Sequence, residues 1–335
     1  MLTCCGGIRI DTVITVEGTA RINEMGGNAI FSAGGARLWR DDVAILGRIG
    51  DNFPQQWLRD LAARGFDVRG IRNIGGIQDH RTFYAYIDRD TRVDTDPAFH
   101  FARIGAPLPP ELADYTSSTR GQDNLDAYEP LTVTPEDLEA LPVASLTALH
   151  IAPGSILTQR NLPPAARARG AACVSVDPSE RLVKPEMQSH LEDVLARIDV
   201  FLPSDMEVAS FFRDDPAMAG DPAAAARWFA ARGPRVVVIK RGSRGAYVYA
   251  HEHDRAWHVP ALAVDVVDVT GAGDSFCGGF MAVYSRTTDP LEAAVCGAAT
   301  ASFTIEDYGA ARLLTATRRD ALDRAASIRA GVVPE

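Results

Sequence analysis

The chain has 335 residues, enough for one large α/β domain or two ordinary ones, and 46% of them are hydrophobic, which is ample for a packed core. The formal net charge of −10 provides no basic field for long polyanions, so we expect no nucleic-acid partner and no membrane partner. The five cysteines are odd in number and lack a C-x-x-C spacing, which argues against a zinc site and indicates reduced thiols.

The start of the sequence, MLTCCGGIRIDTV, has no basic segment followed by a long apolar stretch, and no later apolar run approaches the roughly 20 residues that a membrane span needs. We therefore expect a cytoplasmic protein. Lysine occurs only at Lys184 and Lys240 among many arginines, which makes Lys240 a candidate functional residue. A compositional bias explains the scarcity of lysine equally well.

The first 75 residues alternate between helix and strand patterns. FSAGGARLW (31–39) and FPQQWLRDLAARG (53–65) have the pattern of helices, and DDVAILGRIG (41–50) between them has that of a strand. This alternation is typical of βαβ units around a parallel sheet.

Two segments depart from this alternation. In IDTVITVEGTARI (10–22) and HRTFYAYIDRD (80–90), polar and apolar residues alternate with period two, as in half-exposed antiparallel strands. We expect the two segments to pair as a small sheet, inserted in the main domain at 10–24 and 79–104, that forms a lid.

Residues 91–135 are rich in Pro, Asp, Thr and Gly and show little periodicity. A loop of this length is usually functional or mobile. The sequence leaves two interpretations open, an insert that covers the substrate or a contact with a partner.

From about residue 145 onward, short β-rich runs alternate with helical patterns, which predicts a doubly wound later half. DPAAAARWFAARG (221–233) has an N-cap aspartate, a proline in the first turn and a closing glycine, the signals of a helix. Four runs are expected to be buried strands: LTALHIAP (146–153), AACVSVDP (171–178), IDVFLPS (198–204) and RVVVIKRG (235–242).

The segment VVDVTGAGDSF (266–276) places two glycines and several polar side chains directly after β-branched residues. If residues 265–269 end a strand and a helix begins at Ser275, the turn between them lies where doubly wound sheets bind ligands. Gly271 and Gly273 remove Cβ atoms from this turn, so that backbone amides and the helix dipole can hold one anion.

Asp274 is unexpected beside an anion-binding turn, because a carboxylate repels an anionic ligand and is unfavourable there unless the carboxylate takes part in a reaction. In phosphoryl transfer to a hydroxyl, such a carboxylate accepts the hydroxyl proton. The alternative is that Asp274 or Ser275 only caps the helix. A P-loop and a dinucleotide fingerprint are both absent here, because neither lysine follows a glycine and Phe276 stands at the third glycine position.

The segment DVTGAGDSFCGGF resembles the C-terminal signature of the ribokinase/PfkB carbohydrate kinase family, and ordered motifs extend the resemblance over nearly the whole chain. The resemblance implies a single ribokinase-like domain over 1–335, a three-layer αβα sandwich with a mostly parallel, doubly wound sheet and a small β-sheet lid. It also implies that Asp274 is the catalytic base and that the amides of Gly271, Ala272 and Gly273 form an anion hole.

GGIRID and MGGNAIFSAGGARLWRDDVAILGRIGDN resemble the N-terminal part of the family and imply a sugar site formed by Asp11, Gly26, Gly27 and Asn28. A carboxylate such as Asp11 accepts well from paired hydroxyls, and the alternative is that it only opens a lid strand. Alignment on GARLW places Ile30 where the family has a sugar-binding Asn. Either Asn28 substitutes from a shifted turn, or the substrate lacks the matching hydroxyl.

VIKRGSRGAYVY resembles the segment under the nucleotide, which implies ATP contacts at Lys240, Gly242 and Gly245, although G-S-R-G is also an ordinary turn. LPSDMEV stands where the family has an N-x-x-E motif, with Ser204 in place of Asn and Glu207 retained. The resemblance implies that Ser204 lies at the nucleotide and that Glu207 orders Mg²⁺ through water.

DPSERLVKP resembles a further family motif and implies that Asp177 and Arg181 neighbour the pocket, although Asp177 is equally compatible with a simple turn at a strand end. ASFTIEDYGA resembles the segment that lines the adenine site in the family. Together with the backbone around Asp268 and Thr270, it implies a site for a monovalent cation such as K⁺. A homodimer formed through the lid is also expected.

The expected function is an ATP- and Mg²⁺-dependent kinase that phosphorylates a hydroxymethyl group of a sugar or sugar-like small molecule. A nucleoside kinase of the same family is the alternative within the enzyme class, because Tyr84 or Tyr86 of the lid could stack on a nucleobase. We favour the other role for these tyrosines, which is to pack the lid against its neighbours. A phosphosugar acceptor requires an arginine cluster, which an arginine-rich sequence does not reveal.

Two functions from other classes were weighed against the kinase. A catalytically weak sensor or scaffold with the kinase fold is suggested by Ser204 and Ile30 and opposed by the intact Asp274. A dinucleotide oxidoreductase shares the α/β pattern but lacks the glycine fingerprint.

Overall fold

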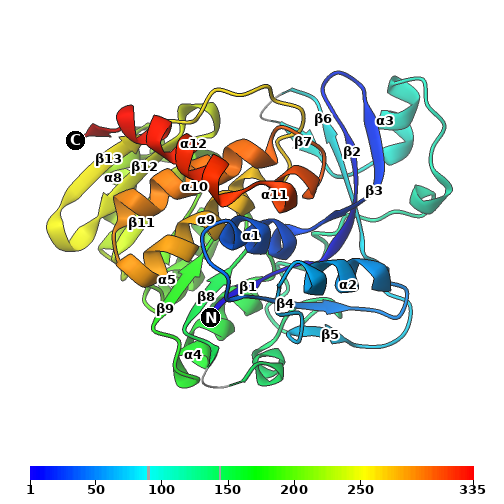
Figure 1. The fold of residues 1–335 in the computed structure, drawn as a ribbon, viewed down its shortest axis with the longest axis horizontal. Coiled ribbons are helices and arrows are strands. Elements are labelled where there is room, and N and C mark those ends of the chain that lie inside the picture. Colours follow the sequence, from blue (N-terminus) through cyan, green and yellow to red (C-terminus); the bar gives the residue numbers. More distant parts are fainter. Residues whose placement is uncertain (89–90, 143–144) are drawn as a thin grey trace.

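The computed structural model describes residues 1–88, 91–142 and 145–335. These residues form a central ten-stranded sheet between two layers of helices and, beside it, a separate four-stranded sheet (Figure 1). The arrangement confirms the expected three-layer αβα sandwich with a smaller second sheet.

The central sheet is parallel over seven neighbouring strands, from β11 to β5, and three antiparallel strands extend one edge. All residues of β1, β8 and β9 are buried, as expected for parallel strands covered by helices on both faces. The spatial order is β14 (Val333–Pro334), β13 (Arg255–Val259), β12 (Ala246–Ala250), β11 (Val236–Lys240), β10 (Val200–Phe201), β9 (Cys173–Val176), β8 (Ala148–Ile151), β1 (Leu2–Cys5), β4 (Val43–Ile49) and β5 (Ile71–Asn73).

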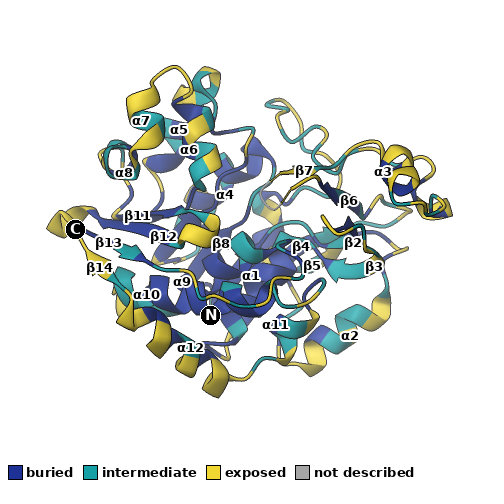
Figure 2. Cartoon of the chain, turned by 90° about the horizontal axis from the view of Figure 1, so that it is seen from above, coloured by how far each residue is buried: buried dark blue, intermediate teal, exposed yellow. Residues whose placement is uncertain are grey.

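Two apolar cores cover the two faces of this sheet, which Figure 2 shows as buried strands between the helix layers. One face carries α1 (Asn28–Arg37), α2 (Gln55–Ala63), α9 (Ala272–Thr287), α10 (Pro290–Thr304), α11 (Ala311–Thr315) and α12 (Arg318–Ala330). The other carries α4 (Ile156–Ala168), α5 (Gln188–Leu195), α6 (Asp205–Phe211), α7 (Pro216–Gly220) and α8 (Pro222–Ala230). Among the described residues, no helix is long and apolar enough to cross a membrane.

The helices predicted at 31–39, 53–65 and 221–233 are present as α1, α2 and α8. As predicted, Asp221 caps α8, and its side chain accepts hydrogen bonds from the amides of Ala223 and Ala224. Short 3₁₀ helices lie at Pro110–Leu112, Pro135–Ala140, Pro185–Met187, Gly242–Arg244 and His251–His253.

Glycines bring α1 and α9 into close contact. A Cβ on Gly278 would lie 1.8 Å from the carbonyl oxygen of Ser32, and a Cβ on Gly35 would lie 2.3 Å from the carbonyl oxygen of Ser275. Because side chains at these positions would push the helices apart, the glycines allow α1 and α9 to pack closely against each other.

The second sheet contains β3 (Ala20–Gly26), β2 (Arg9–Ile14), β6 (Arg81–Tyr86) and β7 (Arg92–Val93), in that order, and is called the lid below. The β2–β3 and β6–β7 pairs are antiparallel, and the two predicted segments pair with each other as expected, through the parallel strands β2 and β6. The reason for the parallel pairing is topological, since β2 and β6 follow β1 and β5, which are parallel strands of one sheet. Residues 89–90 of the predicted second segment lie outside the described residues.

The insert predicted at 91–135 packs against the outer face of the lid. Phe101 of α3 (Pro97–Arg103) and Leu112 form an apolar cluster with Ile14, Phe83 and Ala85 of the lid strands. The later part of the insert turns back and contributes to the cavity described below. The insert therefore covers the outer face of the lid and also contributes to the cavity wall, and both interpretations of its role stay predictions.

The expectation that residues 265–269 end a strand was wrong. Strand β13 ends at Val259, and the β-branched residues that follow run over the surface, where Val266 is 50% exposed. The segment is fixed instead by the backbone amides of Val267 and Asp268, which donate to the carbonyl of Ile305 at 2.7 and 3.3 Å. Helix α9 begins at Ala272, three residues before the predicted start.

Candidate active site

A cavity of about 700 Å³ lies between the carboxyl edge of the central sheet and the lid. Its walls come from the loops after β1, β8, β9 and β10, from the N-termini of α1 and α9, and from the lid. This edge of a doubly wound sheet is the usual place for ligands. The predicted site residues on its walls are Asp11, Gly27, Asn28, Ser204, Glu207, Thr270, Gly271 and Asp274.

The N-terminus of α9 presents backbone amides to this cavity. Gly271 has a φ of +77°, and a Cβ there would lie 2.3 Å from the ring of Phe31, so only glycine fits. The amide of Ala272 donates to the carbonyl of Val269 at 3.2 Å, whereas in the described part of the chain the amides of Gly271 and Gly273 have no acceptor. Two of the three predicted anion-hole amides are therefore unbonded, and Gly271 is the one of the three residues that lines the cavity.

Asp274 lies in the first turn of α9, on the wall of the cavity. Gly271 occupies the N-cap position without a side-chain hydrogen bond, so the interpretation of Asp274 or Ser275 as a helix cap finds no support. Burial raises the pKa of Asp274 to about 6, nearby Asp177 raises it further, and the cations Lys240 and Arg92 oppose the shift. A carboxyl group with this pKa is ionised at neutral pH and basic enough to accept a proton.

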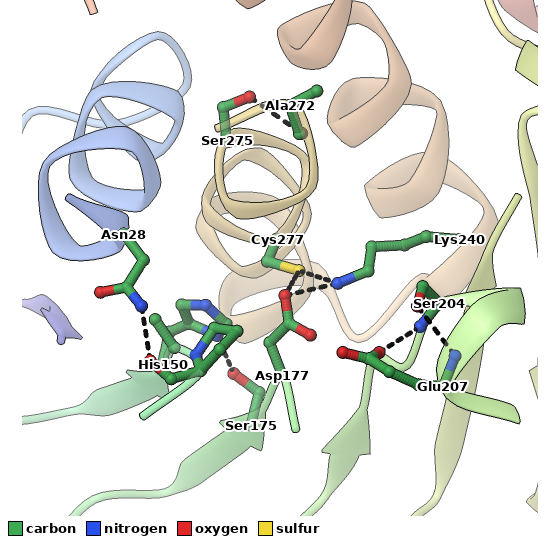
Figure 3. A network of polar contacts seen from close by, with 12 residues as sticks. Asn28, His150, Ser175, Asp177, Ser204, Glu207, Lys240, Ala272, Ser275 and Cys277 are labelled. Carbon is green, nitrogen blue, oxygen red and sulfur yellow. Dashed lines mark hydrogen bonds and ion pairs between the residues drawn. The ribbon is translucent and has the colours of Figure 1, made fainter. Parts of the chain in front are cut away.

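A buried ion pair supports the first turn of α9 from below (Figure 3). The ammonium of Lys240 donates to Asp177, and the thiol of Cys277 donates to the same carboxylate at 3.3 Å. A Cβ on Gly273 would lie 3.6 Å from the Lys240 Nζ, which places the ammonium directly beneath the turn. Neither Lys240 nor Asp177 lines the cavity, so the lysine is placed as a counter-ion behind the wall.

Asp11 is 2% exposed and lies across the cavity from α9, on strand β2 of the lid. Its Oδ2 accepts from the amide of Gly27 at 3.4 Å, and its Oδ1 has no partner among the described residues. Burial raises its pKa to about 7, against the effects of the Gly27 amide and of Arg9. The unpartnered oxygen suits a ligand hydroxyl.

The glycines beside Asp11 are required by close contacts. A Cβ on Gly26 would lie 1.8 Å from the Asp11 Oδ2, and one on Gly27 would lie 2.5 Å from the carbonyl oxygen of Gly7. Asn28 lines the cavity, but its side chain accepts from the amide of Gly7 at 2.6 Å and donates to the carbonyl of Pro153. Ile30 is buried in the core, so Asn28 is the one of the two that reaches the cavity.

Ser204 and Glu207 cap helix α6 reciprocally. The Ser204 hydroxyl accepts from the Glu207 amide at 3.2 Å, and the Glu207 carboxylate accepts from the Ser204 amide at 2.6 Å. Burial raises the pKa of Glu207 to about 7, with a further contribution from Asp177. Both side chains line the cavity, so the cap leaves a carboxylate at the wall.

Three predicted nucleotide or cation residues lie outside the lining of the cavity. Gly242 and Gly245 are in the turn between β11 and β12, where a Cβ on Gly245 would lie 2.0 Å from the carbonyl oxygen of Val259. Asp268 is buried, and its Oδ1 accepts from the Thr270 amide at 2.9 Å while its Oδ2 has no partner in the described chain. Arg181, the predicted pocket neighbour, donates to Thr119 at 3.3 Å.

The lid supplies cavity residues that the sequence analysis missed or left undecided. The Tyr86 hydroxyl is 2.8 Å from the Thr270 hydroxyl, which joins the lid to the α9 wall. Arg9 and Arg92 both line the cavity, and neither was singled out from the sequence. The spacing of two between Arg9 and Asp11 on one strand could have revealed Arg9, whereas Arg92 lies on a two-residue strand that has no periodicity.

The family model described as pfkB family carbohydrate kinase matches residues 113–317, which include the α9 turn with Asp274. The chain belongs to the pfkB family of carbohydrate kinases. As a pfkB family protein, it is a phosphotransferase that acts on an alcohol group.

Two relatives are similar to this pfkB kinase over most of their length. A cytidine kinase of Thermococcus kodakarensis is 27% identical over 296 residues, 88% of this chain and 91% of the relative. An ATP-dependent ribose-1-phosphate kinase of Halopiger xanaduensis is 27% identical over 307 residues, 88% of this chain and 87% of the relative.

The fold of the pfkB kinase is also found in solved structures. An E. coli protein assigned as a ribokinase II, solved with ATP and Mg²⁺, has a TM-score of 0.68 at 22% identity, over 97% of this chain and 99% of that chain. At this identity, the likeness establishes the ribokinase-like fold.

Proposed function

We propose that this protein transfers the γ-phosphoryl group of ATP to a hydroxymethyl group of a sugar or sugar-like molecule, with Asp274 as the general base. The observation that carries the proposal is the position of Asp274, which shares one cavity with Gly271, whose amide is unbonded among the described residues, and with the carboxylate of Asp11.

The proposed transfer uses both walls of the cavity. Asp11 accepts hydrogen bonds from ligand hydroxyls and thereby orients the acceptor, while the Asp274 carboxylate takes the proton of the hydroxymethyl group as its oxygen attacks. The amides of Gly271 and Gly273, at the positive end of the α9 dipole, stabilise the negative charge on the transferred group. The Tyr86–Thr270 contact between lid and α9 helps to keep water out.

The residues of the cavity fit ATP and a divalent cation. The available amides and the helix N-terminus suit a polyphosphate, and the Glu207 carboxylate suits a metal-bound water. Mg²⁺, when bound, neutralises charge on the phosphates. The similar E. coli structure that contains ATP and Mg²⁺ supports this part of the proposal.

Asp268 supports the further proposal of a monovalent cation site. Its buried and unpartnered Oδ2 lies next to Thr270, near the α9 turn. Lys240 and Asp177 are assigned to the electrostatic support of the turn, because their charges meet each other behind the cavity wall.

We treat residues 1–335 as one domain with lid insertions at 10–24 and 79–104. One face of the lid lines the cavity and the other is covered by the chain's own α3 segment, so a homodimer through the lid, which stays a prediction, would have to use the outer strands β3 and β7. A cytoplasmic location also stays a prediction.

A screen of ATP-dependent phosphorylation tests the proposed function. The purified chain is incubated with ATP, Mg²⁺ and a panel of pentoses, hexoses, nucleosides, sugar acids and sugar phosphates, and products are measured by mass spectrometry. We expect one product that gains a phosphate while an equal amount of ADP forms. Binding of ATP without transfer to any acceptor would instead support a sensor or scaffold with the kinase fold.

A further inference from the structure

The inner face of the lid carries six side chains that line the cavity. Strand register places them on one face, because Asp11 pairs with Thr82, Tyr86 pairs with Arg92, and residues two apart on a strand point to the same side. The six are Arg9, Asp11, Thr82, Tyr84, Tyr86 and Arg92. Two of them are arginines, from strands β2 and β7.

Arg9 stands two residues before Asp11 on the same strand. Its guanidinium donates to the carbonyl of Asp79 at 3.2 Å and lies at the cavity wall, partly buried. In the described part of the chain it forms no ion pair within 4.0 Å. A cation in such a place keeps most of its capacity to bind an anion.

Arg92 reaches the same cavity from the other side of the lid. Its guanidinium lies 4.2 Å from the centre of the Tyr84 ring, and it is hydrogen bonded to the side chain of Tyr86. Stacking on an aromatic ring holds a guanidinium in place without neutralising its charge. Arg81, next to Thr82 on the same lid, contrasts with both arginines because it pairs with Asp79 and Asp114 and does not line the cavity.

We propose that Arg9 and Arg92 form an anion subsite and that the acceptor of this kinase is a sugar phosphate with a free hydroxymethyl group; this inference rests on the proposed function. A phosphate monoester carries a charge of about −1.5 to −2 at pH 7, which two guanidinium groups match, whereas a sugar carboxylate requires only one. Asp11, adjacent to Arg9, is left for the sugar hydroxyls.

The chemistry restricts where the phosphate stands on the sugar. The O–H bond of the hydroxymethyl group breaks, its oxygen forms a bond to the γ-phosphorus, the bond from that phosphorus to ADP breaks, and the proton goes to Asp274. The ester phosphate must therefore be on a different carbon, as in a pentose 1-phosphate with a free 5-hydroxymethyl group, and the product is a bisphosphate. A reaction that produces sugar 1-phosphates must supply the acceptor.

The same contacts disfavour a nucleobase against the lid. The Tyr84 ring is the aromatic surface on which a base could stack, and Arg92 lies over it. The hydroxyl of Tyr86, the other lid tyrosine at the cavity, contacts Thr270. Both tyrosines are therefore engaged in positioning lid groups, which is the packing role favoured from the sequence.

The test compares acceptors that share a free hydroxymethyl group. The purified full chain is assayed with ATP and Mg²⁺ on ribose 1-phosphate, ribose, ribonate and cytidine. We expect the kcat/KM for ribose 1-phosphate to exceed that for each of the other three at least 100-fold. Arg9→Gln and Arg92→Gln should each lower it roughly 10- to 100-fold, the range for a lost hydrogen bond to a charged group, and should lower kcat/KM for ribose by a clearly smaller factor.

Arg21→Gln is the matched control, because Arg21 is an exposed lid arginine on β3 that does not line the cavity. It should change both values less than twofold. Arg92→Lys should recover part of the loss on ribose 1-phosphate, since the ammonium keeps the charge without the planar fork. Circular dichroism of each variant checks that the fold is retained.

Three results would overturn the inference. Equal losses on ribose and ribose 1-phosphate would mean that the arginines act on the transferred phosphoryl group. A preference for ribose, ribonate or cytidine would leave the kinase in place and remove the phosphate subsite. Calorimetry of ribose 1-phosphate binding without ATP gives a readout that does not depend on transfer. If Arg92→Gln weakens this binding 10- to 100-fold, the subsite is supported even if no acceptor is phosphorylated. If the variant binds ribose 1-phosphate as tightly as the unmodified protein does, the subsite is ruled out.

Discussion

The two walls of the cavity differ in how the chain builds them. The α9 wall comes from one continuous run, Thr270 to Asp274, in which a helix N-terminus, a strained glycine and a carboxylate follow directly on each other. The lid wall comes from β2, β6 and β7, whose residues meet only through strand pairing. In the proposed function, this difference separates two roles: the α9 wall carries the transfer chemistry, and the lid wall selects the acceptor.

The charges of the two walls differ as well. Behind the α9 wall, the ammonium of Lys240 is matched by the carboxylate of Asp177 within the protein. On the lid wall, Arg9 and Arg92 have no carboxylate partner within ion-pair distance among the described residues. We propose that the first pair adjusts the pKa of Asp274 and that the two arginines bind an anionic group of the acceptor.

The substitution Asp274→Asn tests the proposed catalytic role of the α9 wall most directly. The variant keeps the shape of the α9 wall but removes its proton acceptor, so we expect kcat to fall by roughly 10² to 10⁴ while ATP binding and the fold are retained. Steady-state kinetics and calorimetric titration with ATP measure the two properties. Near-normal turnover would show that the carboxylate has no part in the transfer.

The buried pair behind the wall is tested by Lys240→Met. This change leaves Asp177 buried without its counter-ion, so we expect a loss of about 3–5 kcal/mol in the free energy of unfolding. Asp177→Asn combined with Lys240→Met removes both charges and should cost less than the lysine variant alone. Urea unfolding of the single and double variants measures the coupling, and simple additivity would contradict an interacting pair.

The pH dependence of the reaction tests how the α9 wall tunes its base. Asp274, with a pKa of about 6, must be ionised to accept a proton, so kcat should rise with pH and level off above about pH 6. Asp177→Asn removes a neighbouring negative charge and should move this rise to lower pH. Lys240→Met removes a positive charge and should move it to higher pH, and a rise that shifts the same way in both variants would refute the assignment.

The smallest expected effect concerns the contact between the walls. Tyr86→Phe removes the hydroxyl that meets Thr270 at 2.8 Å and leaves the ring in place. An ordinary hydrogen bond contributes about 1 kcal/mol, so we expect kcat/KM for the acceptor to fall about fivefold and the unproductive hydrolysis of ATP to increase. Both are measured by following ADP and the phosphorylated product separately, and Tyr247→Phe, on strand β12 of the central sheet and outside the cavity lining, serves as the control.

The sequence by itself determined the α9 wall and the alternation of helices and strands around it. Short-range sequence information was sufficient to predict this wall, because the glycine turn, the helix start and the carboxylate are adjacent in the sequence and therefore stay together in the fold. It also predicted the two lid segments, since period-two patterns depend only on neighbouring residues, and the resemblance of GGIRID to the family implied Asp11. The strand proposed at 265–269 failed because β-branched residues also occur in exposed segments that are fixed by distant backbone groups such as Ile305.

Only the tertiary structure decided the rest. Whether Lys240 faces a ligand or a buried carboxylate depends on Asp177, which is 63 residues away, and no local pattern reports such a pairing. The parallel pairing of β2 with β6, which places Arg9 and Arg92 on the wall of one cavity, follows from where two separate strands leave the central sheet. Contacts between residues far apart in the sequence are set by packing and register, and for this reason the proposed acceptor subsite could be inferred only from the folded chain.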